Sequence, residues 1–212
     1  MENSITRDHI PPKVLLAEPF PPNLLTVPAC LDCNRGFQRD DDYTRIVLAL
    51  DLRAQTNRSA AEKLPAIFRS LTRPEAMRFT DSLRSSVSPS SVVDANGRPL
   101  GSVFKPDVSR IEATGKHIAR GLHFSFCGQA LPLDYRLYVH SKPGYDSFDF
   151  FVPHFERFYA KCSAHREGRV GDVFSYVAAS AGDAYAWLLL LYEYFWWAVI
   201  AVPPTFGLSQ SG

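Results

Sequence analysis

The sequence has almost no net charge, because its 23 lysine and arginine residues are balanced by 22 aspartate and glutamate residues. A net charge of +1 gives no bulk attraction to a polyanion, so any contact with nucleic acid must be local. Basic residues are concentrated in the first third of the chain, and most of those are expected to form an ordinary solvated surface of mixed charge. The basic residues of the first third, which an acidic run at 40–42 interrupts, are Lys13, Arg35, Arg39, Arg45, Arg53 and Arg58.

Cysteine is also scarce. The chain has four, Cys30, Cys33, Cys127 and Cys162, and no charged segment followed by an apolar leader at its start. Both features argue against a disulfide scaffold and favour a reducing compartment. We therefore expect a cytoplasmic protein.

One apolar run, residues 184–202, is long enough to raise the question of a membrane span. Glu193 stands at its centre, where a bilayer would oppose insertion by about 2.5–3.5 kcal/mol, and no basic cluster flanks the run. The run and the preceding VFSYVAAS are rich in aromatic and β-branched residues, with a turn signal at residues 181–183. A buried β-hairpin is therefore predicted and no membrane partner is expected. A transmembrane helix stays open as the alternative.

Apolar residues make up 46% of the sequence and aromatic residues 13%, which is ample for a buried core. Proline-rich punctuation and changes of hydrophobic period divide the chain into three parts. Residues 1–55 predict a small N-terminal module, residues 56–98 a helical connector that ends in a loop, and residues 99–212 a β-rich C-terminal domain with a helix around 108–121. The expected fold class is α+β. Strands of the last part are expected at LHFSF (122–126), DYRLYVH (134–140), FDFFVPHF (148–155) and VFSYVAAS (173–180).

Two adjacent residues, Asp8 and His9, form the type of pair that metal-dependent phosphodiester hydrolysis requires. Such a hydrolase needs a group that holds a divalent cation and a neutral histidine that takes a proton from water. If the pair ends a short strand, side-chain alternation lets one residue hold the metal while the other addresses the water. Asn23 and Asn34 offer amide oxygens that suit a Mg²⁺ ligand or a group that fixes the histidine.

Lys13 and Arg35 are close enough in sequence to this pair to hold phosphate oxygens. Spacing alone is a weak signal, however, because each residue has a simpler interpretation. His9 would be an ordinary packing or surface histidine, Asn23 a turn former after a proline, and Asn34 a helix cap.

The order of these residues resembles the HNH endonuclease family, in particular its variants with asparagine at the second metal-binding position. The matching pattern is Asp-His-x-x-Pro, then Asn-Leu-x-x-x-Pro-x-Cys-x-x-Cys-Asn, then a helix entering Asp-Asp-Asp-Tyr, and it covers residues 5–50. The resemblance implies a ββα-metal module. In that module Asp8 would be a metal ligand, His9 the general base, Asn23 the residue that orients the histidine, and Asn34 the second metal ligand.

Two departures from the family pattern affect the metals that are expected. An amide oxygen from Asn34 in place of an imidazole favours Mg²⁺ or Mn²⁺ over softer ions. Family members with a Cys-x-x-Cys at the position of Cys30 and Cys33 commonly have a second Cys-x-x-Cys upstream, which completes a structural zinc site. In this sequence no cysteine precedes Asp8. Two thiolates do not complete a tetrahedral zinc site, and three explanations stay open. The N-terminus of the sequence is truncated or misassigned, the zinc site has been lost, or distant residues supply the other ligands. The distant candidates are Cys127, Cys162 and His165.

The expected function is therefore metal-dependent, endonuclease-like hydrolysis of phosphodiester bonds, with nucleic acid, by default DNA, as the partner. Mg²⁺ or Mn²⁺ is the expected cofactor, and structural Zn²⁺ at Cys30 and Cys33 is as well supported as two reduced thiols. The alternative is a catalytically inactive HNH-fold module that binds nucleic acid or protein.

Overall fold

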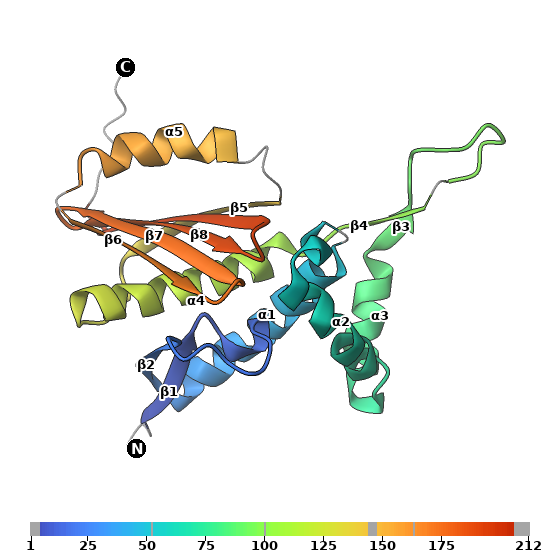
Figure 1. The fold of residues 1–212 in the computed structure, drawn as a ribbon, viewed down its shortest axis with the longest axis horizontal. Coiled ribbons are helices and arrows are strands. Elements are labelled where there is room, and N and C mark those ends of the chain that lie inside the picture. The colour runs from blue at the N-terminus through green and yellow to red at the C-terminus, as the bar shows by residue number, and fades with distance from the viewer. Residues whose placement is uncertain (1–4, 52, 100, 144–147, 163, 206–212) are drawn as a thin grey trace.

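The computed structural model describes residues 5–51, 53–99, 101–143, 148–162 and 164–205. Its centre is a five-stranded sheet with helix α5 on one face and helix α4 on the other (Figure 1). Helix α1 packs on the far side of α4, beside the hairpin of β1 and β2, while α2 and α3 lead away to a two-stranded arm (Figure 1). The mixture of helix and sheet confirms the α+β prediction.

The helices are α1 (Leu31–Leu50), α2 (Arg58–Leu71), α3 (Met77–Ser85), α4 (Val108–Cys127) and α5 (Phe148–Tyr159), with short 3₁₀ turns η1 (Lys13–Leu15), η2 (Ala54–Thr56) and η3 (Pro74–Ala76). The strands outside the large sheet are β1 (Ile5–Ile10), β2 (Leu25–Cys30), β3 (Val87–Pro89) and β4 (Ser102–Phe104). The large sheet has the order β5-β9-β8-β7-β6, with β5 (Arg136–Pro143), β6 (Ala164–Val170), β7 (Phe174–Ala181), β8 (Ala184–Leu191) and β9 (Phe195–Val202).

The first fifty residues form a strand, a loop, a strand and a helix, in the order that the sequence pattern indicates. Strands β1 and β2 pair antiparallel, with Asp8 opposite Val27. Helix α1 begins immediately after β2, because the Sγ atom of Cys30 accepts a hydrogen bond from the backbone N–H of Cys33 at 3.1 Å and caps the helix. Asp32 in the first turn also favours the positive end of the helix dipole.

Helix α4 packs closely on both the large sheet and the hairpin. A Cβ atom at Gly115 would lie 2.8 Å from Cδ1 of Trp197 in β9, and one at Gly121 would overlap Ile10 in β1. Both glycines therefore permit backbone approaches that any larger side chain would prevent. Gly128, with φ of 73°, ends the helix in the left-handed conformation.

The long apolar run at residues 184–202 forms two antiparallel strands of the large sheet, β8 and β9. The predicted β structure is confirmed, and the predicted turn between β7 and β8 is centred on Gly182, with φ of 56°. The run also contains a turn that was not predicted, at residues 192–194, with Glu193 at φ of 55°. In the part of the chain that the structure describes, no helix has the length and apolarity that a membrane crossing needs.

Two strand predictions are wrong. Residues 122–126 (LHFSF) belong to α4, where Leu122 continues the buried face that Ile111 and Ile118 begin at seven- and four-residue spacing. Residues 148–155 (FDFFVPHF) belong to α5. Aromatic content favoured strands in both segments, but this preference depends on context, and packing against the sheet faces decides the outcome.

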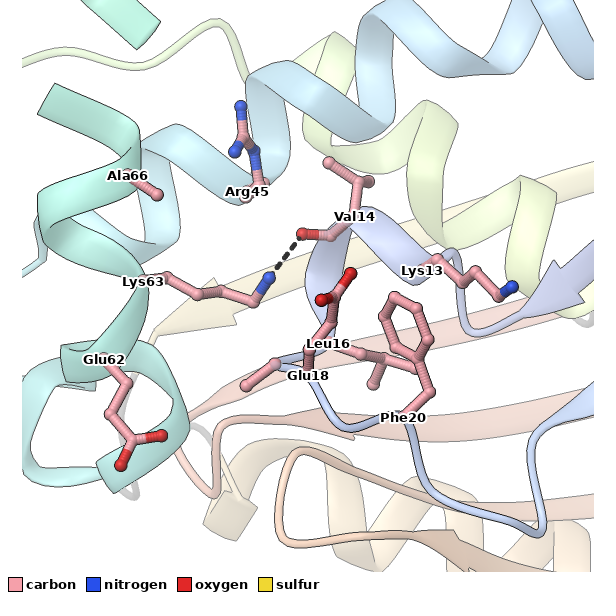
Figure 2. Close-up of a pocket in the computed structure, with 10 residues that line it drawn as sticks. Lys13, Val14, Leu16, Glu18, Phe20, Arg45, Glu62, Lys63 and Ala66 are labelled. Carbon is pink, nitrogen blue, oxygen red and sulfur yellow. Dashed lines mark hydrogen bonds between the residues drawn. The ribbon is translucent and has the colours of Figure 1, made fainter. Parts of the chain in front are cut away.

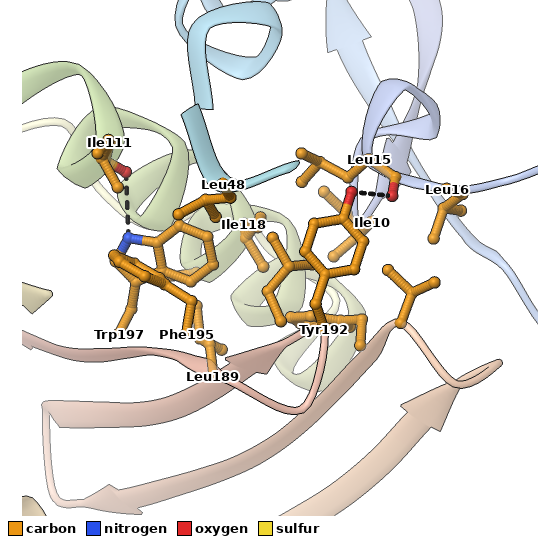
Figure 3. Packing of buried hydrophobic residues seen from close by; sticks show 14 of the residues in the cluster. Ile10, Leu15, Leu16, Leu48, Ile111, Ile118, Leu189, Tyr192, Phe195 and Trp197 are labelled. Atoms are coloured by element: carbon orange, nitrogen blue, oxygen red, sulfur yellow. Dashed lines mark hydrogen bonds between the residues drawn. The ribbon is translucent and has the colours of Figure 1, made fainter. Parts of the chain in front are cut away.

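One continuous cluster of buried side chains runs from Ile10 in β1 to Ala201 in β9. Its largest fully buried members include Trp197, whose indole N–H donates to the carbonyl of Ile111 at 3.1 Å. The hydroxyl of Tyr192, in the turn before β9, donates to the carbonyl of Leu15 at 2.8 Å (Figure 3). The loop between β1 and β2 is therefore attached directly to the end of the large sheet.

This attachment predicts the effect of Tyr192→Phe. The substitution leaves the buried carbonyl of Leu15 without its donor, so the free energy of unfolding is expected to fall by about 1–3 kcal/mol. Urea denaturation followed by circular dichroism measures the change. The control is Tyr194→Phe, whose hydroxyl makes a longer bond of 3.3 Å to Asp51 in a partly buried contact. An equal loss in both variants would contradict the importance of the Leu15 contact.

Candidate functional site

Asp8 is the buried end of the Asp8–His9 pair. Asp8 is 8% exposed and lies on the face of β1 that also carries Ile10 and packs against α4. One carboxylate oxygen, Oδ1, accepts the backbone N–H of His9 at 2.8 Å. The other, Oδ2, lies 2.5 Å from Nε2 of His117 in α4. A residue 109 positions further along the chain therefore fixes this carboxylate.

His117 joins Asp8 to a second buried carboxylate. Its Nδ1 lies 3.0 Å and 3.3 Å from the two carboxylate oxygens of Asp41 in α1, and Asp41 is 4% exposed. The ring of Phe37 stacks on the imidazole at 4.1 Å between centroids and 11° between planes. We call Asp8, His117 and Asp41 the buried triad. An imidazole that faces carboxylates at both nitrogens must donate from both, which requires its protonated form.

The electrostatics of the triad agree with this geometry. Burial alone would lower the pKa of His117, but hydrogen bonds and charge from Asp41 and Asp8 outweigh burial and raise the pKa to about 9. The imidazolium between two carboxylates leaves the triad with one net negative charge. Breaking such a buried group by removing one partner exposes an uncompensated charge to a medium that solvates it poorly.

His9 has the opposite character. It follows Asp8 in the strand, so its side chain points to the other face of the hairpin, where it is partly exposed. Burial lowers its pKa most, the positive charge of Lys13 lowers it further, and Asp8 opposes both. The lowered pKa favours the neutral form of His9, which can accept a proton as a general base must.

Asn34 lies in the first turn of α1, next to the face of β1 that carries Asp8. Its Nδ2 donates to Oγ1 of Thr6 at 3.3 Å, and Thr6 precedes Asp8 by two residues on the same side of the strand. Among the described residues, Oδ1 of Asn34 has no hydrogen-bond partner. An amide oxygen and a carboxylate on one face suit Mg²⁺, which binds one or two protein oxygens and keeps water or substrate phosphate as its other ligands.

The described residues contain no group of three or more His, Cys, Asp or Glu side chains arranged to hold a metal ion. Within the described residues, these side chains do not form a closed metal cage. Cys30 and Cys33 contact each other near the start of α1; their hydrogen bonding lowers the pKa of the Cys30 thiol and raises that of Cys33.

The distant candidates for a zinc site do not lie with these two cysteines. Cys127 is at the end of α4, with its Sγ 3.8 Å from Nδ1 of His123. Cys162 donates from Sγ to the carbonyl of Phe158 at 3.1 Å, and the ring of His165 packs on Tyr159.

Asn23 is engaged at a different place from the one that the family resemblance implies. Its Nδ2 donates to the backbone carbonyl of Arg169 in β6 at 2.7 Å, so it ties the β1–β2 loop to the large sheet. An orienting contact with His9 stays a prediction. The structure thus brings Asp8 and Asn34 to one face and attaches Asn23 elsewhere.

The two cations predicted to bind phosphate lie on different elements. Lys13 begins the η1 turn, with its ammonium 4.9 Å from the centroid of the Phe20 ring. Arg35 is exposed on the first turns of α1. The charge of Lys13 reaches His9, which makes Lys13 the better placed of the two.

Two residues of the buried triad were missed at the level of sequence. Asp41 belongs to the acidic run at residues 40–42, and neither Asp41 nor His117 was assigned a role from the sequence. The available signal was helical spacing: Asp41 shares a face of α1 with Phe37, Thr44 and Leu48. Thr44 marks the same face because its hydroxyl is 2.9 Å from that of Thr114 in α4.

Comparison of the chain with protein-family models, curated proteins and solved structures gives no significant match. The assignment of a function therefore depends on the site itself.

The raised pKa of His117 makes stability depend on pH. The protonated form is favoured in the folded state, so its contribution is complete below the unfolded value of 6.5 and is lost as the pH rises through about 9. A shift of this size corresponds to on the order of 3 kcal/mol. The stability advantage of the wild type over His117→Gln is expected to shrink from pH 6 to pH 10 in urea titrations. An advantage that is flat or grows over this range would contradict the charge state proposed for His117.

Adjacent aspartates provide a matched test of the triad. Asp41→Asn removes one of the two carboxylates that accept from His117 and weakens a buried, charged hydrogen bond, so it is expected to cost about 1.5–3 kcal/mol of unfolding free energy. Asp42→Asn removes a charge one residue away whose side chain is 42% exposed and pairs with Arg45 at 3.4 Å. Its cost is expected to stay below about 1 kcal/mol. Equal losses in thermal or urea unfolding would show that Asp41 has no special role.

Proposed function

We propose that this protein is an HNH-like, metal-dependent hydrolase of phosphodiester bonds in nucleic acid, with DNA as the expected substrate. The observation that supports this proposal best is the placement of Asp8 and Asn34 on one face of the β1–β2–α1 unit, with a neutral His9 next to Asp8. A hydrolase of this class needs oxygen ligands for a divalent cation and an unprotonated imidazole within the same small unit.

In this proposal His9 accepts the proton of the attacking water. Asp8 and Asn34 would hold Mg²⁺ or Mn²⁺, which when bound neutralises charge on the scissile phosphate and on the leaving oxygen. His117 holds the carboxylate of Asp8 in one orientation through Oδ2, as hydrogen-bonded outer groups commonly do for ligating carboxylates. Lys13, whose charge acts on His9, would contact a phosphate oxygen.

A catalytically inactive module that binds nucleic acid or protein is the second candidate. Two observations favour it. Both carboxylate oxygens of Asp8 already have a hydrogen-bond partner, and Asn23 is bonded to the backbone of Arg169. Either contact would have to persist beside a metal ion, or rearrange, for the site to act.

Plasmid nicking separates the two candidates. With Mg²⁺ or Mn²⁺ the wild-type chain is expected to nick supercoiled DNA, and His9→Ala is expected to lower the rate by roughly 10²-fold or more because the general base is lost. The control His140→Ala removes an exposed histidine of β5 and is expected to leave the rate unchanged. Asp8→Asn should abolish the response to metal. Nicking that survives His9→Ala would overturn the role of His9 as the general base, and a wild type that never nicks would favour the inactive module.

A further inference from the structure

A cavity of about 480 Å³ lies between the β1–β2 loop, α1 and α2. Its volume falls within the range of ligand pockets, which is about 300–1,000 Å³. Three basic side chains line it: Lys13 from the loop, Arg45 from α1 and Lys63 from α2 (Figure 2). Of these three residues, only Lys13 was predicted from the sequence to bind a ligand, and α2 was expected to serve as a connector.

Lys63 extends from α2 toward the loop, where its ammonium donates to the carbonyl of Val14 at 2.9 Å (Figure 2). An ammonium has three donors, and a neutral carbonyl uses one of them. Burial lowers the pKa of Lys63 to about 8, with a further contribution from Arg45, while Glu18 opposes the shift. No carboxylate in the described part of the chain lies within salt-bridge distance of Lys63.

Arg45 is the second cation with unused donors. Its side chain is 17% exposed, and one Nη atom lies 3.4 Å from the carboxylate of Asp42. Its Nε is buried, with no hydrogen-bond partner among the residues that the structure describes. Two cations that repel each other beside a cavity, with donors left over, are stabilised by an anion that accepts several hydrogen bonds.

The surrounding carboxylates do not supply that anion. Glu62 accepts a hydrogen bond from Nε of Arg58 at 2.7 Å, and Asp42 pairs with Arg45. Glu18, in the exposed loop, points into the cavity without an ion pair in the described structure (Figure 2). The basic residues that line the cavity are Lys13, Arg45 and Lys63, and the acidic ones are Glu18 and Glu62. The region therefore carries an excess of positive charge.

We propose that Arg45 and Lys63 bind a phosphate group of the nucleic-acid backbone in this cavity, as a contact additional to the scissile phosphate of the proposed function. The identity of the ligand rests on the proposed function, because free phosphate shares the chemistry of a backbone phosphate. Continuity with the catalytic unit supports a backbone phosphate: Lys13 lines the cavity and its charge also acts on His9. Phosphate contacts of this type position a nucleic acid without reading its sequence.

The test measures binding without cleavage. A fluorescently labelled DNA duplex is titrated with the full chain in EDTA, and anisotropy is recorded at several salt concentrations. Lys63→Gln and Arg45→Gln are each expected to weaken binding by about 5–10-fold and to reduce the salt slope by about 1. Glu18→Gln, at an exposed loop position, is expected to strengthen binding because it removes a repelling carboxylate.

Arg69→Gln is the matched control, since Arg69 is an exposed cation of the same helix that does not line the cavity. Its affinity is expected to stay within about twofold of the wild type. An equal effect of Arg69→Gln, no effect of the cavity variants, or weaker binding by Glu18→Gln would overturn the proposal. Circular dichroism verifies that each variant is folded, and Glu18→Gln tests the cavity without disturbing a buried residue.

Two further arms separate the possible sources of phosphate and the possible failures. Inorganic phosphate is titrated by calorimetry. If phosphate binding depends on Lys63 but duplex binding does not, the cavity is assigned to free phosphate and the backbone proposal is overturned. A wild type that binds duplex through Lys63 but never nicks plasmid overturns the nuclease function and supports this inference. If the wild type nicks plasmid but Lys63→Gln and Arg45→Gln bind duplex normally, the nuclease function is supported and this inference is overturned. Absence of any duplex binding overturns both.

Discussion

The contact of His117 with Asp8 and Asp41 organises the N-terminal half of this protein. Each carboxylate is buried on a different element, and neither has enough water around it to carry its charge alone. An imidazolium between them satisfies both and fixes the distances among β1, α1 and α4. The hydrophobic contacts around it are less specific, because apolar side chains tolerate small shifts, whereas a short charged hydrogen bond requires defined atom positions. The hairpin and the capped start of α1 depend on local contacts, and the contacts of His117 attach both of them to α4.

The parts of the fold that depend on local pattern were predictable. The apolar residues 43, 46, 47 and 50 have the three- and four-residue spacing of the helix that follows the acidic run, and turn signals indicated the β7–β8 hairpin. The failures occur where local preference and packing disagree. LHFSF alternates like a strand, but Leu122 continues the buried face of a helix that begins at Val108. Glu193 interrupts the apolar run, and it was used as an argument against a membrane span. In the structure it lies in the turn between β8 and β9, and this turn is recognisable only once both strands are placed in the sheet.

The candidate site divides in the same way. Asp8, His9 and Asn34 were identified because they lie within one short unit, so their order in sequence reflects their order in space. His117 was not assigned, since no sequence pattern connects a helix residue to a strand 109 positions earlier. Asp41 was hidden among three adjacent aspartates, of which the structure buries only the second. Arg45 and Lys63 were equally unremarkable until two helices and a loop placed their donors around one cavity.

The order in which the chain is synthesised gives the buried triad a further consequence. The β1–β2 hairpin and α1 emerge first, and at that stage both carboxylates must keep their water, because the cation that replaces it lies in a helix that does not yet exist. Long-range contacts of this kind form late, after loop-closure entropy has been overcome. A nascent chain that ends before α4 therefore carries every residue of the motif and lacks the arrangement that holds Asp8 in place. Asp8 is fixed in its observed orientation only when α4 has been synthesised and His117 contacts it.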